Sequence, residues 1–253
     1  WSITPGALCV PNSTTCSDPG TVTLCDDTGL SIERTFACAG TCVNGACDDV
    51  AAPAIDACDP AAPIIAGGTV AKFNYDDLNN DVEIPSSGCT GTLTDGPDAF
   101  FNVEVPAGEV LVVTALHAGA TFEDVQLYVI DDCAMAQATC RAGVANDDAA
   151  SFDTTLNWYN SDAAPVVVTV GVDNESTSVD NDITVIVYSK PSECVPGQPF
   201  QCALTGDAIE YCNESGLFER FDCGGNGVCS NGACEEPSAQ YCIDALTLNP
   251  AGE

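Results

Sequence analysis

The sequence has 253 residues, and its 38 acidic side chains against 5 lysines and arginines give a formal net charge of −33. A chain this acidic repels phosphate backbones and anionic lipid, so nucleic acids and membrane surfaces are poor partners and divalent cations are good ones. The hydrophobic fraction of 45% is large enough for a folded core. The 17 cysteines indicate an oxidising, extracellular or cell-surface location. The chain contains no run of about 18 apolar residues that would span a bilayer.

Residues 1–50 are predicted to form a small module held together by disulfides. A chain of this length buries too little apolar surface to fold unaided, and three disulfides at roughly 2–4 kcal/mol each would supply the missing stability. Two β-like stretches, 21–25 and 31–38, flank the turn sequence Asp-Asp-Thr-Gly, which predicts a two-stranded ribbon followed by a stapled loop. The six cysteines are Cys9, Cys16, Cys25, Cys38, Cys42 and Cys47.

Residues 51–190 show the two-residue alternation of β-strands. In the stretch 100–105, for example, Phe101, Val103 and Val105 alternate with polar neighbours. Several short strands without a helical period predict an all-β, antiparallel β-sandwich. The predicted strands are 100–105, 110–115, 125–130, 154–159, 165–172 and 183–188, with 69–75 as an edge strand. Its four cysteines lie in an order that suggests the pairs Cys58–Cys89 and Cys133–Cys140, because these close the shortest loops.

Residues 191–236 repeat the first module. The tripeptide Cys-Val-Pro opens both copies, Asn-Gly-Ala-Cys closes both, and the intervals between cysteines differ by at most two residues. This is an internal repeat. Such drift in spacing disfavours a tetrahedral zinc site and favours three disulfides within each copy, although sequence does not choose among the 15 possible pairings. The cysteines of the second copy are Cys194, Cys202, Cys212, Cys223, Cys229 and Cys234.

Residues 237–253 resume the pattern that follows the first module. Cys242 stands in Ser-Ala-Gln-Tyr-Cys-Ile-Asp as Cys58 stands in Ala-Ile-Asp-Ala-Cys-Asp-Pro. We therefore interpret this segment as the start of a further sandwich repeat or as a joining segment. On this interpretation the odd seventeenth cysteine finds its partner in a further repeat, and the alternatives are a free thiol or an intermolecular bridge.

The central segment resembles the bacterial pre-peptidase C-terminal domain, in the variant found in large secreted proteins of myxobacterial type. The resemblance covers about 130 residues and rests on Gly-Pro-Asp before the strand at 100–105, Phe-Glu-Asp-Val-Gln-Leu-Tyr-Val at 122–129 and Asn-Asp-Asp at 146–148. It implies a calcium-associated, jelly-roll-like sandwich appended to extracellular proteins. The chain departs from the family where Glu123-Asp124-Val125 stands in place of Asp followed by Thr.

The acidic loops of the predicted sandwich are candidate calcium ligands. Calcium takes six to eight hard oxygens from carboxylates, amides and backbone carbonyls, and loops at one end of a sandwich can supply them. The alternative is that these acids only keep the surface soluble, and no EF-hand loop is present. The resemblance to the pre-peptidase C-terminal domain favours the calcium site over this alternative. The candidate ligands are Asp98, Glu123, Asp124, Asn146, Asp147, Asp148 and Asp153.

The sequence offers no clear catalytic motif. A histidine-dependent triad would have to use His117, the single histidine, and no Gly-x-Ser-x-Gly elbow occurs. We expect a non-enzymatic structural segment of an extracellular, repeat-built filament, stalk or surface fibre, whose partners are copies of itself, adjoining repeats of the same chain and divalent cations. The alternative is an appendage that binds polysaccharide or protein for a secreted hydrolase.

Overall fold

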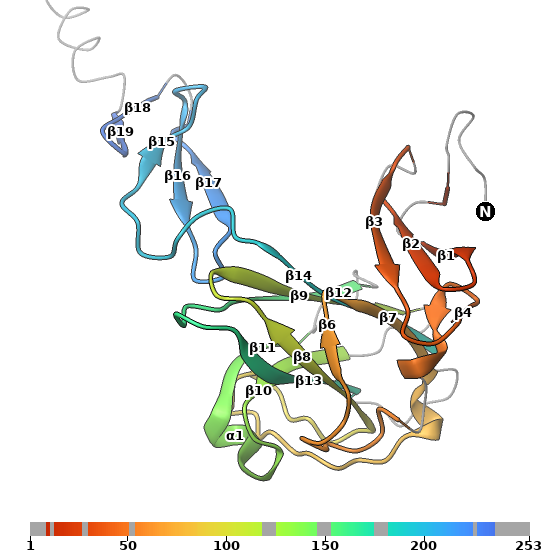
Figure 1. The fold of residues 1–253 in the computed structure, drawn as a ribbon. Helices are drawn as coiled ribbons and strands as arrows, with labels where there is room; N and C mark the ends of the chain where they lie inside the picture. Colours follow the sequence, from red (N-terminus) through yellow and green to blue (C-terminus); the bar gives the residue numbers. More distant parts are fainter. Residues whose placement is uncertain are drawn as a thin grey trace, which may run out of the picture. The chain divides into compact units, whose positions relative to one another are not determined.

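The computed structural model describes residues 9–10, 13–26, 30–50, 54–117, 125–145, 153–174, 182–224 and 227–235. The chain is all-β and disulfide-rich, as predicted (Figure 1). It divides into two compact units, Trp1–Lys190 and Pro191–Glu253, so the first module and the sandwich belong to one unit. Within the described residues, no helix is long and apolar enough to cross a membrane.

The first module holds three antiparallel strands and a separate hairpin. The strands are β1 (Thr14–Asp18), β2 (Thr21–Cys25) and β3 (Ile32–Ala37), and the hairpin pairs β4 (Cys42–Val43) with β5 (Ala46–Cys47) before the short helix η1 (Asp48–Val50). β2 and β3 are the predicted ribbon. β1 was not predicted, because its threonines and serine show no apolar alternation. The predicted stapled loop is itself a hairpin.

The repeated Asn-Gly dipeptide is the turn of that hairpin in both copies. Asn44 and Gly45 have φ angles of 53° and 78°, and Asn231 and Gly232 have 51° and 74°. Positive φ at both central residues is the signature of the type I′ turn, which joins two strands with their natural twist and favours Asn-Gly. The motif that marks the repeat in the sequence is therefore a structural turn.

The second module repeats this architecture. Its strands are β15 (Gln201–Cys202), β16 (Ala208–Cys212) and β17 (Phe218–Asp222), followed by the hairpin of β18 (Val228–Ser230) and β19 (Ala233–Glu235). The central pairs are equivalent: Val22 pairs with Phe36 in the first module, and Ile209 pairs with Phe221 in the second, although the first module has a bulge between Leu24 and Cys25 that the second lacks.

All six cysteines of each module pair within that module, with Cα–Cα distances of 5.2–6.0 Å. Both copies join the first cysteine to the third, the second to the fifth and the fourth to the sixth. The pairs are Cys9–Cys25, Cys16–Cys42, Cys38–Cys47, Cys194–Cys212, Cys202–Cys229 and Cys223–Cys234.

The central domain is a sandwich of two sheets (Figure 1). The five-stranded sheet has the order β11-β10-β13-β8-β6 and the four-stranded sheet the order β12-β9-β14-β7. The strands are β6 (Ile64–Ala66), β7 (Thr69–Asn74), β8 (Asp98–Val105), β9 (Glu109–His117), β10 (Val125–Ile130), β11 (Cys140–Ala145), β12 (Asp153–Tyr159), β13 (Val166–Asn174) and β14 (Asp182–Pro191). The six predicted strands and the edge strand β7 are present. β6 and β11 were missed, and β6 pairs with β8 in parallel, against the antiparallel prediction.

The main core lies between the two sheets and follows from the alternation of the strands. Phe101 and Val103 of β8, Leu127 of β10, Val113 of β9 and Val185 of β14 are all nearly inaccessible to solvent. Burial of such side chains stabilises the fold by roughly 1.5–3 kcal/mol each. The alternate side chains of the five-stranded sheet point to its outer face, which a second layer covers.

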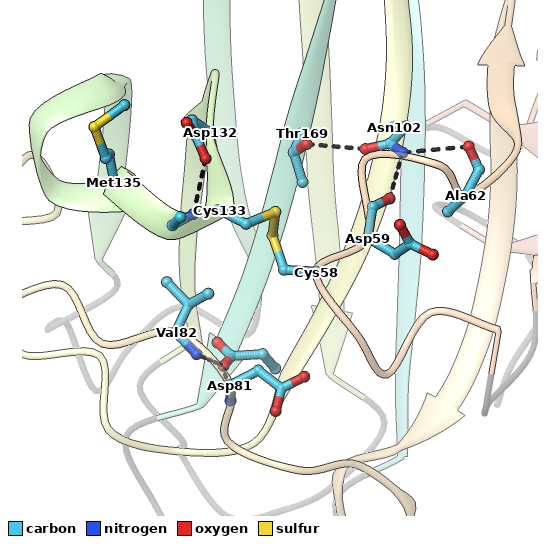
Figure 2. Close-up of a disulfide and its surroundings, with 12 residues drawn as sticks. Cys58, Asp59, Ala62, Asp81, Val82, Asn102, Asp132, Cys133, Met135 and Thr169 are labelled. Atoms are coloured by element: carbon cyan, nitrogen blue, oxygen red, sulfur yellow. Dashed lines mark hydrogen bonds between the residues drawn. A yellow bond between two sulfur atoms is a disulfide. The ribbon is translucent and has the colours of Figure 1, made fainter.

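That second layer consists of residues 54–62 and 75–97, the covering segment, which flanks β6 and β7 in the chain and covers the outer face of the five-stranded sheet. The covering segment contains the short helix η2 (Tyr75–Asp77). A second short helix, η3 (Cys133–Met135), follows β10 and leads into α1 (Ala136–Thr139). A small buried cluster forms under it, made of Val82, Ile84, Phe100, Tyr128, Ile130 and Ala136. The Asn102 side chain donates hydrogen bonds to the carbonyls of Asp59 and Ala62 and fixes the start of the segment (Figure 2).

The predicted pairing of the four central cysteines is wrong. Cys58 pairs with Cys133 (Figure 2) and Cys89 with Cys140, across 75 and 51 residues. Both bridges tie the covering segment to the β10–β11 edge of the sheet below it. Gly143 in β11 permits the second, because a side chain there would come within 2.8 Å of the Cys89 backbone. Loop length does not predict the pairing here, because the covering segment folds back over strands that come later in the chain.

The first module packs against the outer face of the four-stranded sheet. The Phe36 ring lies 6.0 Å from that of Tyr188 in β14, and Phe36 is only 3% exposed. Arg34 stacks on the same tyrosine at 4.1 Å, and its guanidinium donates a hydrogen bond to the Ser189 carbonyl. Gly68 leaves the space for this contact, because a side chain there would meet Tyr188 and the Val187 carbonyl at 2.7 Å. An aromatic and cation–π contact therefore joins module and sandwich.

Candidate functional site

Two aspartates face each other at one end of the five-stranded sheet. Asp98 begins β8 and Asp173 lies next to the end of β13, and the two residues are direct partners in the antiparallel register. They lie on the outer face of the sheet, together with Tyr128 of β10, beneath the covering segment. All three side chains are buried, with no measurable exposure.

The Asp98 carboxylate is held by three donors. The backbone amides of Asp81 and Val82 both donate to its Oδ2 at 2.9 Å, and the Tyr128 hydroxyl donates to Oδ1 at 3.0 Å. Asp81 and Val82, whose backbone amides make these two hydrogen bonds, are labelled in Figure 2. Hydrogen bonds of this kind favour the ionised form of the acid.

The Asp173 carboxylate has no such support. Both of its oxygens are buried, and neither has a hydrogen-bond partner among the described residues. In the described part of the chain, no lysine or arginine forms an ion pair with either aspartate. A buried carboxylate left without a partner is strongly unfavourable, so this site requires either a bound cation or a retained proton.

The pKa shifts of Asp98 and Asp173 also indicate that the pair needs a bound cation or a retained proton. Burial is the main cause that raises the pKa of Asp98, against the opposing effect of its donors. Burial and the neighbouring Asp98 together raise the pKa of Asp173 far above the ordinary aspartate value. Burial, reinforced by both negative charges, likewise raises the pKa of the Tyr128 hydroxyl. Two like charges at close range in a dry site are stabilised by a positive ion.

Gly171 makes room for the tyrosine of the site. It pairs with Tyr128 across the β10–β13 ladder, and a side chain at this position would lie 2.1 Å from the Tyr128 ring. The ring therefore lies over the glycine and carries its hydroxyl to Asp98. Glycine in a strand interior often marks such a close approach.

We expect Gly171→Ala to destabilise the protein by about 1–3 kcal/mol or more, because the added methyl group displaces the Tyr128 ring from a packed layer. Urea denaturation with intact disulfides would measure the change. Gly20→Ala is the matched control, since its added methyl group meets nothing closer than 3.8 Å, and it should stay within about 0.5 kcal/mol of the parent. Equal effects of both substitutions would contradict the close approach.

The predicted ligands fall into three groups. Asp98 lies in the buried pair. Asp153 is the first residue of β12, in the other sheet. The remaining five lie outside the described residues: Glu123, Asp124, Asn146, Asp147 and Asp148.

The described strand ends that flank these loops meet at one end of the sandwich. Thr154, at the start of β12, donates a hydrogen bond to the carbonyl of Val125, at the start of β10. Asp98 and Asp173 lie at the same end, because Val125 and Gln126 pair with the last two residues of β13.

Asp173 was not among the predicted ligands. The sequence carries only a weak signal for this site. Asp173 follows Val170-Gly171-Val172, and the two-residue alternation of the strand places Asp173 on the same face of the sheet as Gly171. Elsewhere in the described chain, one group has the spacing of a metal site, Cys38 with Cys47 and Asp49. Its two sulfurs are bonded to each other, so it is not a site.

In comparisons with known proteins, no family model, no curated protein and no solved structure matched the chain. The resemblance to the pre-peptidase C-terminal domain therefore stays a hypothesis that rests on the sequence motifs.

Proposed function

We propose that the protein is a non-enzymatic structural segment of an extracellular, repeat-built assembly. The observation that carries this proposal is the way the first module is built into the sandwich. Phe36, Leu24 and Val22 form a buried face of the module, and Phe36 and Leu24 lie beside Tyr188 of the sheet. A module fixed in this way sets the orientation of the domain that follows it, which is what a stiff array of repeats requires.

The chemistry of the chain supports an extracellular place for this assembly. Eight disulfides staple the described residues, and such density is typical of oxidising compartments. The duplicated module also supports a structural role, because both copies keep the same strand order, central strand pairs and disulfide connectivity.

We further propose that a divalent cation, calcium by the chemistry of its oxygen ligands, stabilises the sandwich. The residues present fit such an ion: Asp173 offers two unpartnered buried oxygens, and Asp98 adds a second negative charge beside them. The predicted loop ligands outside the described residues stay candidates for the rest of the coordination. The ion would offset the repulsion within the pair and reduce the effect of the −33 charge on packing between repeats.

Electron microscopy of native extracellular material, labelled with an antibody against the second module, tests the structural role. We expect the label to recur along filaments or stalks at a spacing near one module plus one sandwich. Label confined to monodisperse particles, in material that retains its disulfides, would contradict a repeat-built assembly.

A further inference from the structure

The second module exposes the face that the first module buries. Ile209 pairs with Phe221 as Val22 pairs with Phe36, so the two phenylalanines occupy equivalent places in equivalent sheets. Phe36 is 3% exposed, whereas Phe221 is 63% exposed. The difference lies in what covers the two faces, because the modules share their strands, central strand pairs and disulfides.

This exposed surface is an aromatic patch, which we call the aromatic face and which is lined by Phe200, Ile209, Tyr211 and Phe221. The rings of Phe200 and Tyr211 meet edge to face at 5.6 Å. Exposed aromatic side chains gathered on one side of a small acidic module are characteristic of docking surfaces. Phe218 lies on the same strand but on the opposite side of the sheet, since side chains alternate along a strand.

We infer, on the basis of the structural role proposed above, that the aromatic face docks onto the outer sheet face of a further β-sandwich of the same kind. The first module shows how: its equivalent face is covered by β14 of the sandwich that follows it, with Phe36 against Tyr188. The sequence after the second module resumes the same landmarks, with Cys242 in the place of Cys58. The occupant is therefore a sandwich that follows the module, as residues 54–190 follow the first.

One position makes the two faces selective. Arg34, which pairs with Leu24, stacks on Tyr188 and bonds to the Ser189 carbonyl. In the second module Glu219 takes this place opposite Tyr211. A glutamate in this place can neither donate to the Ser189 carbonyl nor stack as a cation on Tyr188, so the sandwich described here fits Glu219 poorly. The sandwich that the second module binds should instead carry a group that donates to a carboxylate at this point, which makes the two faces selective.

Hydroxyl-radical footprinting read by mass spectrometry tests the docking. The probe is a tandem chain in which residues 51–190 are repeated after Glu235, with Glu219→Arg so that the aromatic face matches the repeated sandwich. Labelling of Phe221 should fall to the level of Phe36 in the same sample, while Phe218 stays labelled as in the unextended chain. The unextended chain with Glu219→Arg is the control and should keep Phe221 fully labelled.

Native extracellular material gives a second reading that does not depend on how the tandem chain folds. There the unmodified Phe221 should be protected to the level of Phe36. Phe221 that stays as reactive as in the purified chain, in both the native material and the tandem chain, would overturn the inference. Protection that appears only with added polysaccharide would assign the face to substrate binding and overturn it as well. Filaments in which Phe221 stays unprotected would support the structural role and contradict the docking. Protection of Phe221 in material without filaments would support the docking and contradict the structural role.

Discussion

Replacing Asp173 by asparagine is expected to raise the stability of the protein in chelator and to remove its stabilisation by calcium. Without a cation, both oxygens of this buried carboxylate lack partners, and replacing it by a neutral amide, which can donate to Asp98, should increase the free energy of unfolding by about 1–3 kcal/mol. With calcium at a hundred times its dissociation constant, the parent should gain about 2.7 kcal/mol. The variant loses a ligand and should gain far less. Thermal and urea unfolding in chelator and in calcium would measure this reversal.

The control is Asp77→Asn, which makes the same charge change at an exposed aspartate of η2. It should leave the difference between calcium and chelator as it is in the parent. A parent protein whose unfolding is indifferent to both chelator and millimolar calcium would contradict the cation site and leave a pair that shares a proton.

Such a proton would be visible in the dependence of stability on pH in chelator. The folded-state pKa of Asp173 is raised, so above the unfolded value of about 4 the folded protein holds a proton that the unfolded chain has released. Stability in chelator should therefore fall as the pH rises above about 4 and continue to fall up to the folded-state pKa. Asp173→Asn should flatten this slope, and saturating calcium should reduce it in the parent.

Removing the bridge between Cys58 and Cys133 is expected to have the second large effect. The bridge closes a loop of 75 residues, and the loss of a cross-link over a loop that long should cost about 4.5 kcal/mol on the chain-entropy model. It should also free the covering segment from the β10–β11 edge, where it shields the carboxylate pair. Unfolding of the Cys58→Ser, Cys133→Ser double variant would measure this cost.

The matched comparison is the Cys38→Ser, Cys47→Ser double variant, which opens a loop of only 9 residues in the first module. On the same model it should cost about 2.5 kcal/mol. Non-reducing peptide mapping should recover Cys58 joined to Cys133 and Cys89 joined to Cys140. Peptides that join Cys58 to Cys89 would contradict the pairing described here.

The sequence by itself determined the features that depend on neighbouring residues. The alternation at 100–105 and 183–188 requires strands with one buried face, and both are strands of the sandwich. The cysteine spacing showed that there are two modules of one kind, and Asn-Gly in each is a type I′ turn because only such residues adopt positive φ there at low cost.

Tertiary structure alone decided the pairing of side chains that lie far apart in the chain. Asp98 and Asp173 meet because β13 lies between β10 and β8, and no local pattern encodes that order when connections pass from one sheet to the other. Cys58 joins Cys133 for the same reason. Phe36 and Phe221 have the same local sequence role and the same strand register, yet one is buried and the other exposed. A strand's alternation states which side chains share a face, and only the fold states what lies against that face.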